Sequence, residues 1–209
     1  GAVRFPGFEG QEWHIAKLGT LAQLTAGGTP STRIPEYWNG NIRWMKSGEV
    51  HLKRIHDVEN RITQEGLENS SAKLLPVNSV LIALAGQGKT RGTVAINEVE
   101  LSTNQSVAAI IPNSDQLHYE YLFYNLDSRY EELRRLSTGD GGRGGLNLKI
   151  LSRVKIPIPP IPEQIRISEV ARFTDTEIDI WVEHTNQLKR QKTGLMQRLL
   201  TGEIRVRED

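Results

Sequence analysis

The stretch IPIPPIPEQIRI at residues 156–167 decides how this chain is divided. Four prolines in it fix φ and lack a backbone N–H donor, so a helix cannot run through them. The last of them, Pro162, suits the first turn of a helix, where N–H groups have no intrahelical partner anyway. We therefore expect one globular domain over residues 1–156, followed by a proline-rich junction and a long helix over residues 157–209.

The residues after the junction predict a single helix from Glu163 to about Leu199, roughly 55 Å long at 1.5 Å per residue. Apolar residues recur along it in steps of three and four, with polar interruptions at Thr174, Thr185 and Lys192. This spacing is typical of a helix that pairs with another helix, so we expect dimerisation through it. We call its apolar members the coiled-coil seam: Ile167, Ala171, Ile178, Trp181, Leu188, Leu195 and Leu199.

Charge is distributed unevenly along this helix. Residues 161–184 carry two arginines and six acids, a net charge of −4, whereas residues 185–202 carry four basic residues and no acid, a net charge of +4. Two copies would therefore be electrostatically complementary only when antiparallel. The alternative is a solvated polar face whose charges match the helix dipole, which favours acids at the start of a helix and bases at its end.

The residues before the prolines predict a mixed domain. Short runs rich in branched residues alternate with turn residues and indicate strands at 42–45, 79–84, 92–96 and 106–111. Residues 117–136 have apolar and aromatic side chains three or four apart, which indicates one or two amphipathic helices. The predicted fold class is α+β: a mixed globular domain followed by one long C-terminal, coiled-coil-forming α-helix.

Composition limits the possible partners and compartments. The chain has 209 residues with 26 Lys+Arg against 25 Asp+Glu, so its formal charge is only +1 and any contact with nucleic acid must come from a local patch. Cysteine is absent, which excludes disulfides and thiolate metal sites and is compatible with a reducing cytoplasm. The longest apolar run has six residues, so we expect no membrane contact and a cytoplasmic protein.

A glycine-rich segment at residues 85–90 has some features of a phosphate-binding loop. A Walker A loop needs a glycine where this sequence has Ala83, and a helix where residues 92–96 predict a strand. We therefore interpret the segment as a hairpin loop whose side chains contact base edges and phosphates, since these residue types suit such contacts. The alternative is a solvated turn. Its candidate DNA-binding residues are Gln87, Lys89, Thr90 and Arg91.

A second candidate surface is the stretch at residues 43–54, in which basic and aromatic residues interleave as they often do on nucleic-acid surfaces. The alternative interpretation is a strand with Trp44 buried and the charges outside. A further glycine-rich segment at residues 138–145 contains another arginine, and is either a DNA contact or a connector. The candidates outside the first loop are Arg33, Arg43, Lys46, Ser47, Lys53, Arg54 and Arg143.

Enzyme signatures are missing from the sequence. It has no Gly-x-Ser-x-Gly elbow, no cysteine, no Glu-x-Lys of the common nuclease type and no adenine-methyltransferase tetrad. The spacing of His51, His56 and Asp57 indicates a metal site only weakly, because such residues more often lie solvated on the surface. We therefore expect a binding module with no catalytic residue, metal or cofactor of its own. Two alternatives remain, a coiled-coil assembly adaptor without DNA specificity and an unrecognised nucleotide hydrolase.

An ordered set of motifs along nearly the whole chain resembles the specificity (S) subunits of type I restriction-modification systems. The most specific is the Pro-Pro-x-Pro-Glu-Gln run of the junction directly before a long helix. The remaining motifs are RFPGF at residues 4–8, Trp13, LG at 18–19, GGTP at 27–30, YW at 37–38, IRW at 42–44, KLLP at 73–76, the loop at 86–92, NQ at 104–105, LNL at 146–148 and LMQRLLTG at 195–202.

The resemblance implies a noncatalytic DNA-recognition subunit with a target recognition domain at residues 1–156. It implies two partner subunits: an adenine-N6 methyltransferase that binds S-adenosylmethionine, and a translocating endonuclease, so that S-adenosylmethionine, ATP and Mg would be bound by partners. Each recognition domain in such subunits recognises one half of a split target, and paired antiparallel helices separate the halves. A complete subunit has two such domains, and this sequence resembles half of one.

Overall fold

The computed structural model describes residues 4–86, 88–136 and 145–205, and divides the chain into two compact units, Gly1–Ser168 and Glu169–Asp209. The predicted α+β class with one long C-terminal helix is confirmed. The first unit extends through Ser168 rather than ending at residue 156, because the proline stretch and the first turns of the helix pack against the domain.

A five-stranded sheet forms the centre of the first unit, with strand order β2-β9-β6-β7-β4. Neighbouring strands are antiparallel except β4 and β7, which are parallel. The predicted strands at 79–84, 92–96 and 106–111 are its three central members, and every residue of β6 and β7 is buried, as expected for a sheet covered on both faces. The strands are β2 (Ala22–Ala26), β4 (Arg54–Ile55), β6 (Val80–Ala83), β7 (Val94–Asn97) and β9 (Val107–Pro112).

Two smaller sheets flank this one. The predicted strand at 42–45 is the end of the longer β3, which pairs with β5 and β8, while β1 pairs with β10. These strands are β1 (His14–Lys17), β3 (Trp38–Met45), β5 (Arg61–Ile62), β8 (Ser102–Thr103) and β10 (Lys155–Ile158). Short helices connect them: α1 (Leu18–Leu21), η1 (Pro35–Tyr37), η2 (Ser47–Leu52), α2 (Gln64–Glu68) and α5 (Leu148–Ser152).

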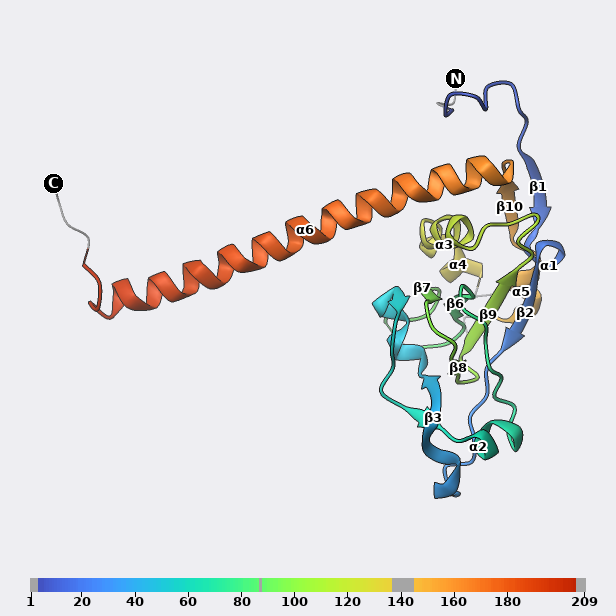
Figure 1. Cartoon of the computed structure of the whole chain (residues 1–209), viewed down its shortest axis with the longest axis horizontal. Coiled ribbons are helices and arrows are strands. Elements are labelled where there is room, and N and C mark those ends of the chain that lie inside the picture. Colours follow the sequence, from blue (N-terminus) through green and yellow to red (C-terminus); the bar gives the residue numbers. More distant parts are fainter. Residues whose placement is uncertain (1–3, 87, 137–144, 206–209) are drawn as a thin grey trace. The chain divides into compact units, whose positions relative to one another are not determined.

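The two faces of the central sheet belong to two hydrophobic clusters. The predicted helical region at 117–136 is two helices, α3 (Tyr119–Asp127) and α4 (Tyr130–Leu136), and α3 contacts β6 and β7 (Figure 1). Alternate strand residues such as Ile82 and Ile96 pack with these helices, whereas Leu81 and Ala95 face the cluster beneath η2 and β4. This alternation follows from the two-residue period of a strand.

The proline stretch is partly a strand. Pro157 lies in β10 and opposite Ile15 of β1, and Figure 1 shows these two strands side by side. Proline is compatible with this place because the sheet has only two strands, so one edge of each lacks a neighbour. Helix α6 (Ile161–Leu200) follows after two residues, close to the bounds that the sequence predicts.

The Glu-Gln pair after the prolines anchors the first turn of α6 to the domain. Glu163 is buried and accepts two hydrogen bonds of 2.7 Å from Arg4 and one of 3.0 Å from Trp13 Nε1. Gln164 is also buried: its Oε1 accepts from the backbone N–H of His118 at 2.8 Å, and its Nε2 donates to the carbonyl oxygens of Gln116 and Pro159. Each polar atom of the motif therefore has a partner within the domain.

The second unit contains the rest of α6. Seam residues Ile178, Trp181 and Leu188 are each at least half exposed there. Ile167, the first residue of the seam, differs from them because it lies in the first unit, half-buried against that unit's core. Within the described residues, none of the helices has the length and apolar character needed to cross a membrane.

Candidate nucleic-acid interface

The glycine-rich segment at 85–90 is the turn of a β-hairpin. It joins antiparallel strands β6 and β7, and no helix begins at its end. A phosphate-binding loop places phosphate at a helix N-terminus. The predicted hairpin is therefore present, and among the described residues no helix follows the loop where a phosphate-binding loop would need one. Contact of the loop with DNA stays a prediction.

Helix α4 holds the backbone of this hairpin loop from one side. The hydroxyl of Tyr130 donates to the carbonyl oxygen of Lys89 at 2.9 Å, and Arg134 Nη1 donates to the carbonyl oxygen of Gly88 at 2.9 Å. Arg134 also donates to the Tyr130 hydroxyl at 2.8 Å, and its guanidinium lies 5.5 Å from the centre of the Tyr130 ring. Two consecutive loop carbonyls are thus fixed by two coupled side chains.

Glycine is required where this loop returns to the sheet. Gly92 has φ +84°, and a Cβ there would meet the Arg134 side chain at 3.3 Å. Its N–H donates to the carbonyl oxygen of Ala83 at 2.9 Å, which closes the hairpin. A larger residue at this position would both strain the backbone and displace Arg134.

The predicted contact residues of the loop differ in exposure. Lys89 is exposed, whereas Thr90 and Arg91 are half-buried. Gln87 and Arg143 lie outside the described residues. Gly145, the last residue of the second glycine-rich segment, lies beside the carbonyl oxygen of Leu84, directly after β6. Gly145 and the hairpin loop therefore lie at the same end of β6.

Three of the four basic residues of the 43–54 stretch, Arg43, Lys53 and Arg54, pair with acids that lie outside it. Arg43 forms an ion pair with Asp57 at 2.9 Å, and Arg61 forms a second ion pair with Asp57 at 2.7 Å. The hydrogen bond from Arg43 lowers the pKa of the Asp57 carboxyl. Lys53 pairs with Asp127 of α3 at 2.5 Å.

Arg54 is the most enclosed base of this stretch. It pairs with Glu98 at 3.2 Å and Glu120 at 3.0 Å, bonds the hydroxyl of Tyr124, and lies 5.7 Å from the centre of the Phe123 ring. Burial alone would lower the pKa of the guanidinium, but the hydrogen bond to Tyr124 and the charge of Glu120 raise the pKa above its ordinary value. This arginine links β4 to α3 inside the domain.

Three candidate residues lie nearer the surface. Arg33 and Lys46 are exposed and Ser47 is half-buried. Neither of these two bases has an ion pair within the part of the chain that the structure describes. Trp44 is buried and its Nε1 donates to the carbonyl oxygen of Gly28 at 2.9 Å, as the alternative interpretation of this stretch expected.

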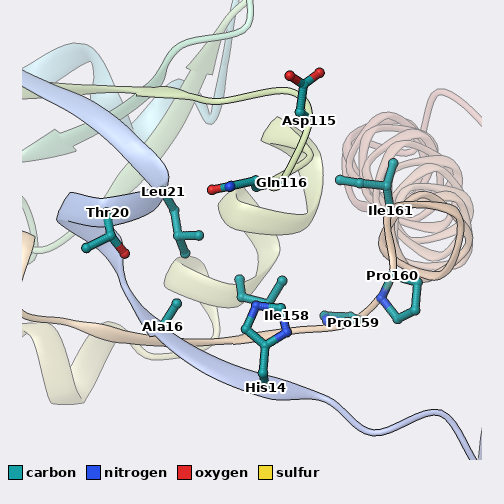
Figure 2. Close-up of a pocket in the computed structure, with 10 residues that line it drawn as sticks. All are labelled: His14, Ala16, Thr20, Leu21, Asp115, Gln116, Ile158, Pro159, Pro160 and Ile161. Carbon is teal, nitrogen blue, oxygen red and sulfur yellow. The ribbon is translucent and has the colours of Figure 1, made fainter.

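A cavity of about 460 Å³ lies where β1 and β10 meet the start of α6. Figure 2 shows the His14 imidazole and the Asp115 carboxylate on opposite sides of it, so these two groups do not form an acid–base pair. The rest of its lining is mainly apolar: Ile158, Pro159 and Ile161 come from the junction, and Ala16 and Leu21 from β1 and α1.

The histidines of the weak metal spacing make contacts of their own. His51 Nδ1 lies 2.6 Å from the carbonyl oxygen of Gly48, and His56 Nδ1 lies 3.1 Å from Glu98. Over residues 4–86, 88–136 and 145–205, no group of three or more His, Cys, Asp or Glu side chains could hold a metal ion.

Sequence reasoning missed the residues that hold the hairpin loop. Tyr130 and Arg134 are four residues apart on α4, the spacing of side chains that meet on one helix face, and this was the available signal. Their carbonyl partners lie 41 and 46 residues away in sequence, so the pair could not be assigned to the loop without the fold.

Comparison with known proteins gives relatives for most of the chain. The specificity subunit of the EcoR124I/EcoR124II type I restriction enzyme of Escherichia coli is 33% identical over 168 residues, which cover 79% of this chain and 41% of that subunit. The MjaIX specificity subunit of Methanocaldococcus jannaschii is 31% identical over 176 residues, covering 81% of this chain and 39% of that subunit. The chain thus spans less than half the length of these curated relatives.

Solved structures share the fold at lower identity. The HsdS subunit from Thermoanaerobacter tengcongensis superimposes with a TM-score of 0.63 at 21% identity, and the match covers 95% of this chain and 46% of that one. The family model for the type I restriction modification DNA specificity domain matches residues 10–190. Since this match covers far more than half of the sequence, the chain belongs to the type I restriction-modification DNA specificity domain family.

Proposed function

We propose that this chain recognises duplex DNA by sequence, as the DNA-recognition subunit of a type I restriction-modification system in the cytoplasm. The observation that carries the proposal is the hairpin loop, which presents exposed Lys89 and half-buried Arg91 from a backbone held by α4. A lysine can neutralise a phosphate, and an arginine can form two hydrogen bonds to a guanine edge. Family membership supports DNA as the ligand.

In this role the chain would carry out no chemical step itself. It would direct an adenine-N6 methyltransferase subunit and, through the complex, an endonuclease subunit. S-adenosylmethionine, ATP and Mg would then be bound by those partners. A second solved structure with this fold comes from a type I restriction-modification system and concerns the assembly of its complex. That protein therefore works as part of a complex, and we propose the same for this chain.

The proposed assembly is an antiparallel homodimer through the coiled-coil seam. Trp181 is 65% exposed and Leu195 is 53% exposed, so apolar area is available for burial against a partner helix. Burial of this apolar area would supply the affinity, because each exposed ion pair contributes only about 0.2–1 kcal/mol. The charges would decide between the antiparallel and the parallel orientation. A twofold dimer would place one recognition domain on each half of an inverted repeat separated by a spacer.

Light scattering tests the dimer with two variants of neighbouring residues. Trp181→Glu should give the 23.5 kDa monomer at micromolar concentration, because it places a charge in the seam. The matched control is Ile180→Glu, which makes the same change on another face of the helix and should leave the dimer intact. A wild-type monomer over the same concentrations would overturn the homodimer.

Selection from a pool of randomised duplexes tests DNA recognition. The chain, alone and with its methyltransferase subunit, should enrich one bipartite sequence and should retard it more strongly than a scrambled duplex of equal composition. Failure to enrich any sequence in either form, with retardation equal for all duplexes, would favour the assembly adaptor. ATP turnover by the purified chain would instead favour a nucleotide hydrolase.

A further inference from the structure

The hairpin loop has a support that the proposed function does not by itself require. Attraction of basic side chains to phosphates tolerates variation in loop geometry and does not need fixed carbonyls. Here Tyr130 and Arg134 each donate to one of two consecutive loop carbonyls, those of Lys89 and Gly88. They are also joined to each other by a 2.8 Å hydrogen bond from Arg134 to the Tyr130 hydroxyl, so the two contacts adjoin each other.

We propose that Tyr130 and Arg134 are positioning residues that pre-organise the hairpin loop for discrimination between DNA sequences. This inference rests on the proposed function, because it assigns a role to residues behind a loop that contacts DNA. Holding a loop in its bound conformation before association reduces the entropy lost on binding. Hydrogen bonds to base edges need fixed geometry, whereas attraction to phosphates tolerates variation.

The position of the pair behind the loop supports a positioning role. Tyr130 is half-buried, and its hydroxyl is engaged on one side by a loop carbonyl and on the other by Arg134. The Arg134 side chain fills the space beside Gly92, where a Cβ would approach it to 3.3 Å. The loop return, the tyrosine and the arginine are therefore packed as one unit.

Hydrogen bonds within the loop also fix its backbone, and Thr93 makes two of them. The hydroxyl of Thr93 donates to the carbonyl oxygen of Lys89 at 2.7 Å, and the Thr93 N–H donates to the carbonyl oxygen of Thr90 at 3.0 Å. The Lys89 carbonyl therefore accepts from both Thr93 and Tyr130. Loss of the Tyr130 hydroxyl removes one of the two hydrogen bonds from α4 to the loop backbone and leaves the internal turn bonds in place.

The test compares two conservative variants with wild type on two duplexes. One duplex is the sequence that the wild-type chain enriches, and the other is its scrambled form. Tyr130→Phe and Arg134→Gln should each weaken binding to the enriched duplex by about tenfold and leave the scrambled duplex within about twofold. The dependence of binding on salt should not change, because neither variant removes a phosphate contact.

Two controls separate positioning from direct contact and from general damage. Lys89→Ala removes an exposed charge and should make the negative slope of log K against log salt less steep by about 1. Tyr121→Phe removes the same kind of hydroxyl, one that donates to the Pro157 carbonyl at the junction, and should leave the ratio between the two duplexes unchanged. Amide exchange at Gly92 and Thr93 should accelerate in Tyr130→Phe and stay at the wild-type rate in Tyr121→Phe.

The other outcomes distinguish failure of the proposed function from failure of the positioning role. If wild type enriches no duplex, the proposed function fails, and this inference fails with it. If Lys89→Ala lowers the slope while Tyr130→Phe and Arg134→Gln preserve the ratio between duplexes, the proposed function stands and the positioning role is wrong. If Arg134→Gln makes the negative salt slope less steep by about 1, that arginine contacts a phosphate, and the positioning role is again wrong.

Discussion

The hairpin loop and the 43–54 stretch have similar basic composition but use their charges differently. In the stretch, Arg54 is held by two glutamates and Lys53 by Asp127, so these charges connect parts of the domain. In the loop, Lys89 is exposed while α4 fixes its carbonyl instead. The difference shows that a run of bases in the sequence need not form a free basic surface, because acids distant in sequence can neutralise it.

The largest expected effect follows from removing the most enclosed base. Arg54→Met should lower the free energy of unfolding by about 3–5 kcal/mol, because it leaves the largely buried carboxylate of Glu120 without its cation. Thermal or urea unfolding measures this loss. Arg43→Met is the matched control, since the Asp57 partner of Arg43 is solvent-exposed, and it should leave the unfolding free energy nearly unchanged. Equal stability of the two variants would contradict the structural role of Arg54.

The next effect concerns base recognition by the loop. Arg91→Ala should weaken binding to the enriched duplex by about 1–3 kcal/mol and relax the preference at one base pair, if its guanidinium contacts a base edge. Competition binding with single-base variants of the duplex measures both quantities. A uniform loss over all duplexes would assign Arg91 to a phosphate, and no loss would remove it from the interface.

A smaller effect separates the two lysines of the comparison. Lys89→Ala should reduce the salt slope by about 1, because an exposed lysine can release a counterion on meeting a phosphate. Lys53→Ala should leave the slope unchanged, since the Lys53 ammonium already pairs with Asp127 at 2.5 Å. Anisotropy titrations at four or five salt concentrations supply the slopes. The reverse order of the two slopes would place the DNA contact on the 43–54 stretch.

The smallest effect is a dependence of stability on pH near Glu120. Burial lowers the pKa of His118, and the charge of Glu120 only partly opposes this. A histidine whose pKa is lower in the folded state stabilises the fold above its unfolded pKa, and this stability is lost as pH falls. Unfolding free energy should therefore decline slightly from pH 7 to pH 5 in wild type. His118→Gln should lack this part of the decline; an identical pH profile would contradict it.

Sequence predicted those parts of the fold that local pattern specifies. The central strands are continuous apolar runs such as residues 80–83, and α6 is a long periodic segment, so both were assigned close to their observed bounds. Strands β4, β5 and β8 have two residues each, too few for a period, and depend on pairing across the fold.

The candidate site was less predictable for the same reason. The glycines of the loop at 85–90 indicated a turn, but no local feature showed that α4 supports it. Arg54 looked like a surface base, because its partners Glu98 and Glu120 lie 44 and 66 residues away. The Glu163 and Gln164 motif was recognised as a resemblance, and its physical role became clear only from the partners that bury it.

Mapping modified adenines tests DNA recognition by this chain most directly. The DNA would come from cells that express the methyltransferase subunit with either the wild-type chain or Arg91→Ala. With wild type we expect N6-methyladenine in one inverted repeat interrupted by a spacer of fixed length. With Arg91→Ala we expect the same spacer but a relaxed base at one position in each half. Methylation that is independent of this chain, or confined to a continuous asymmetric sequence, would contradict recognition of a split target by this chain.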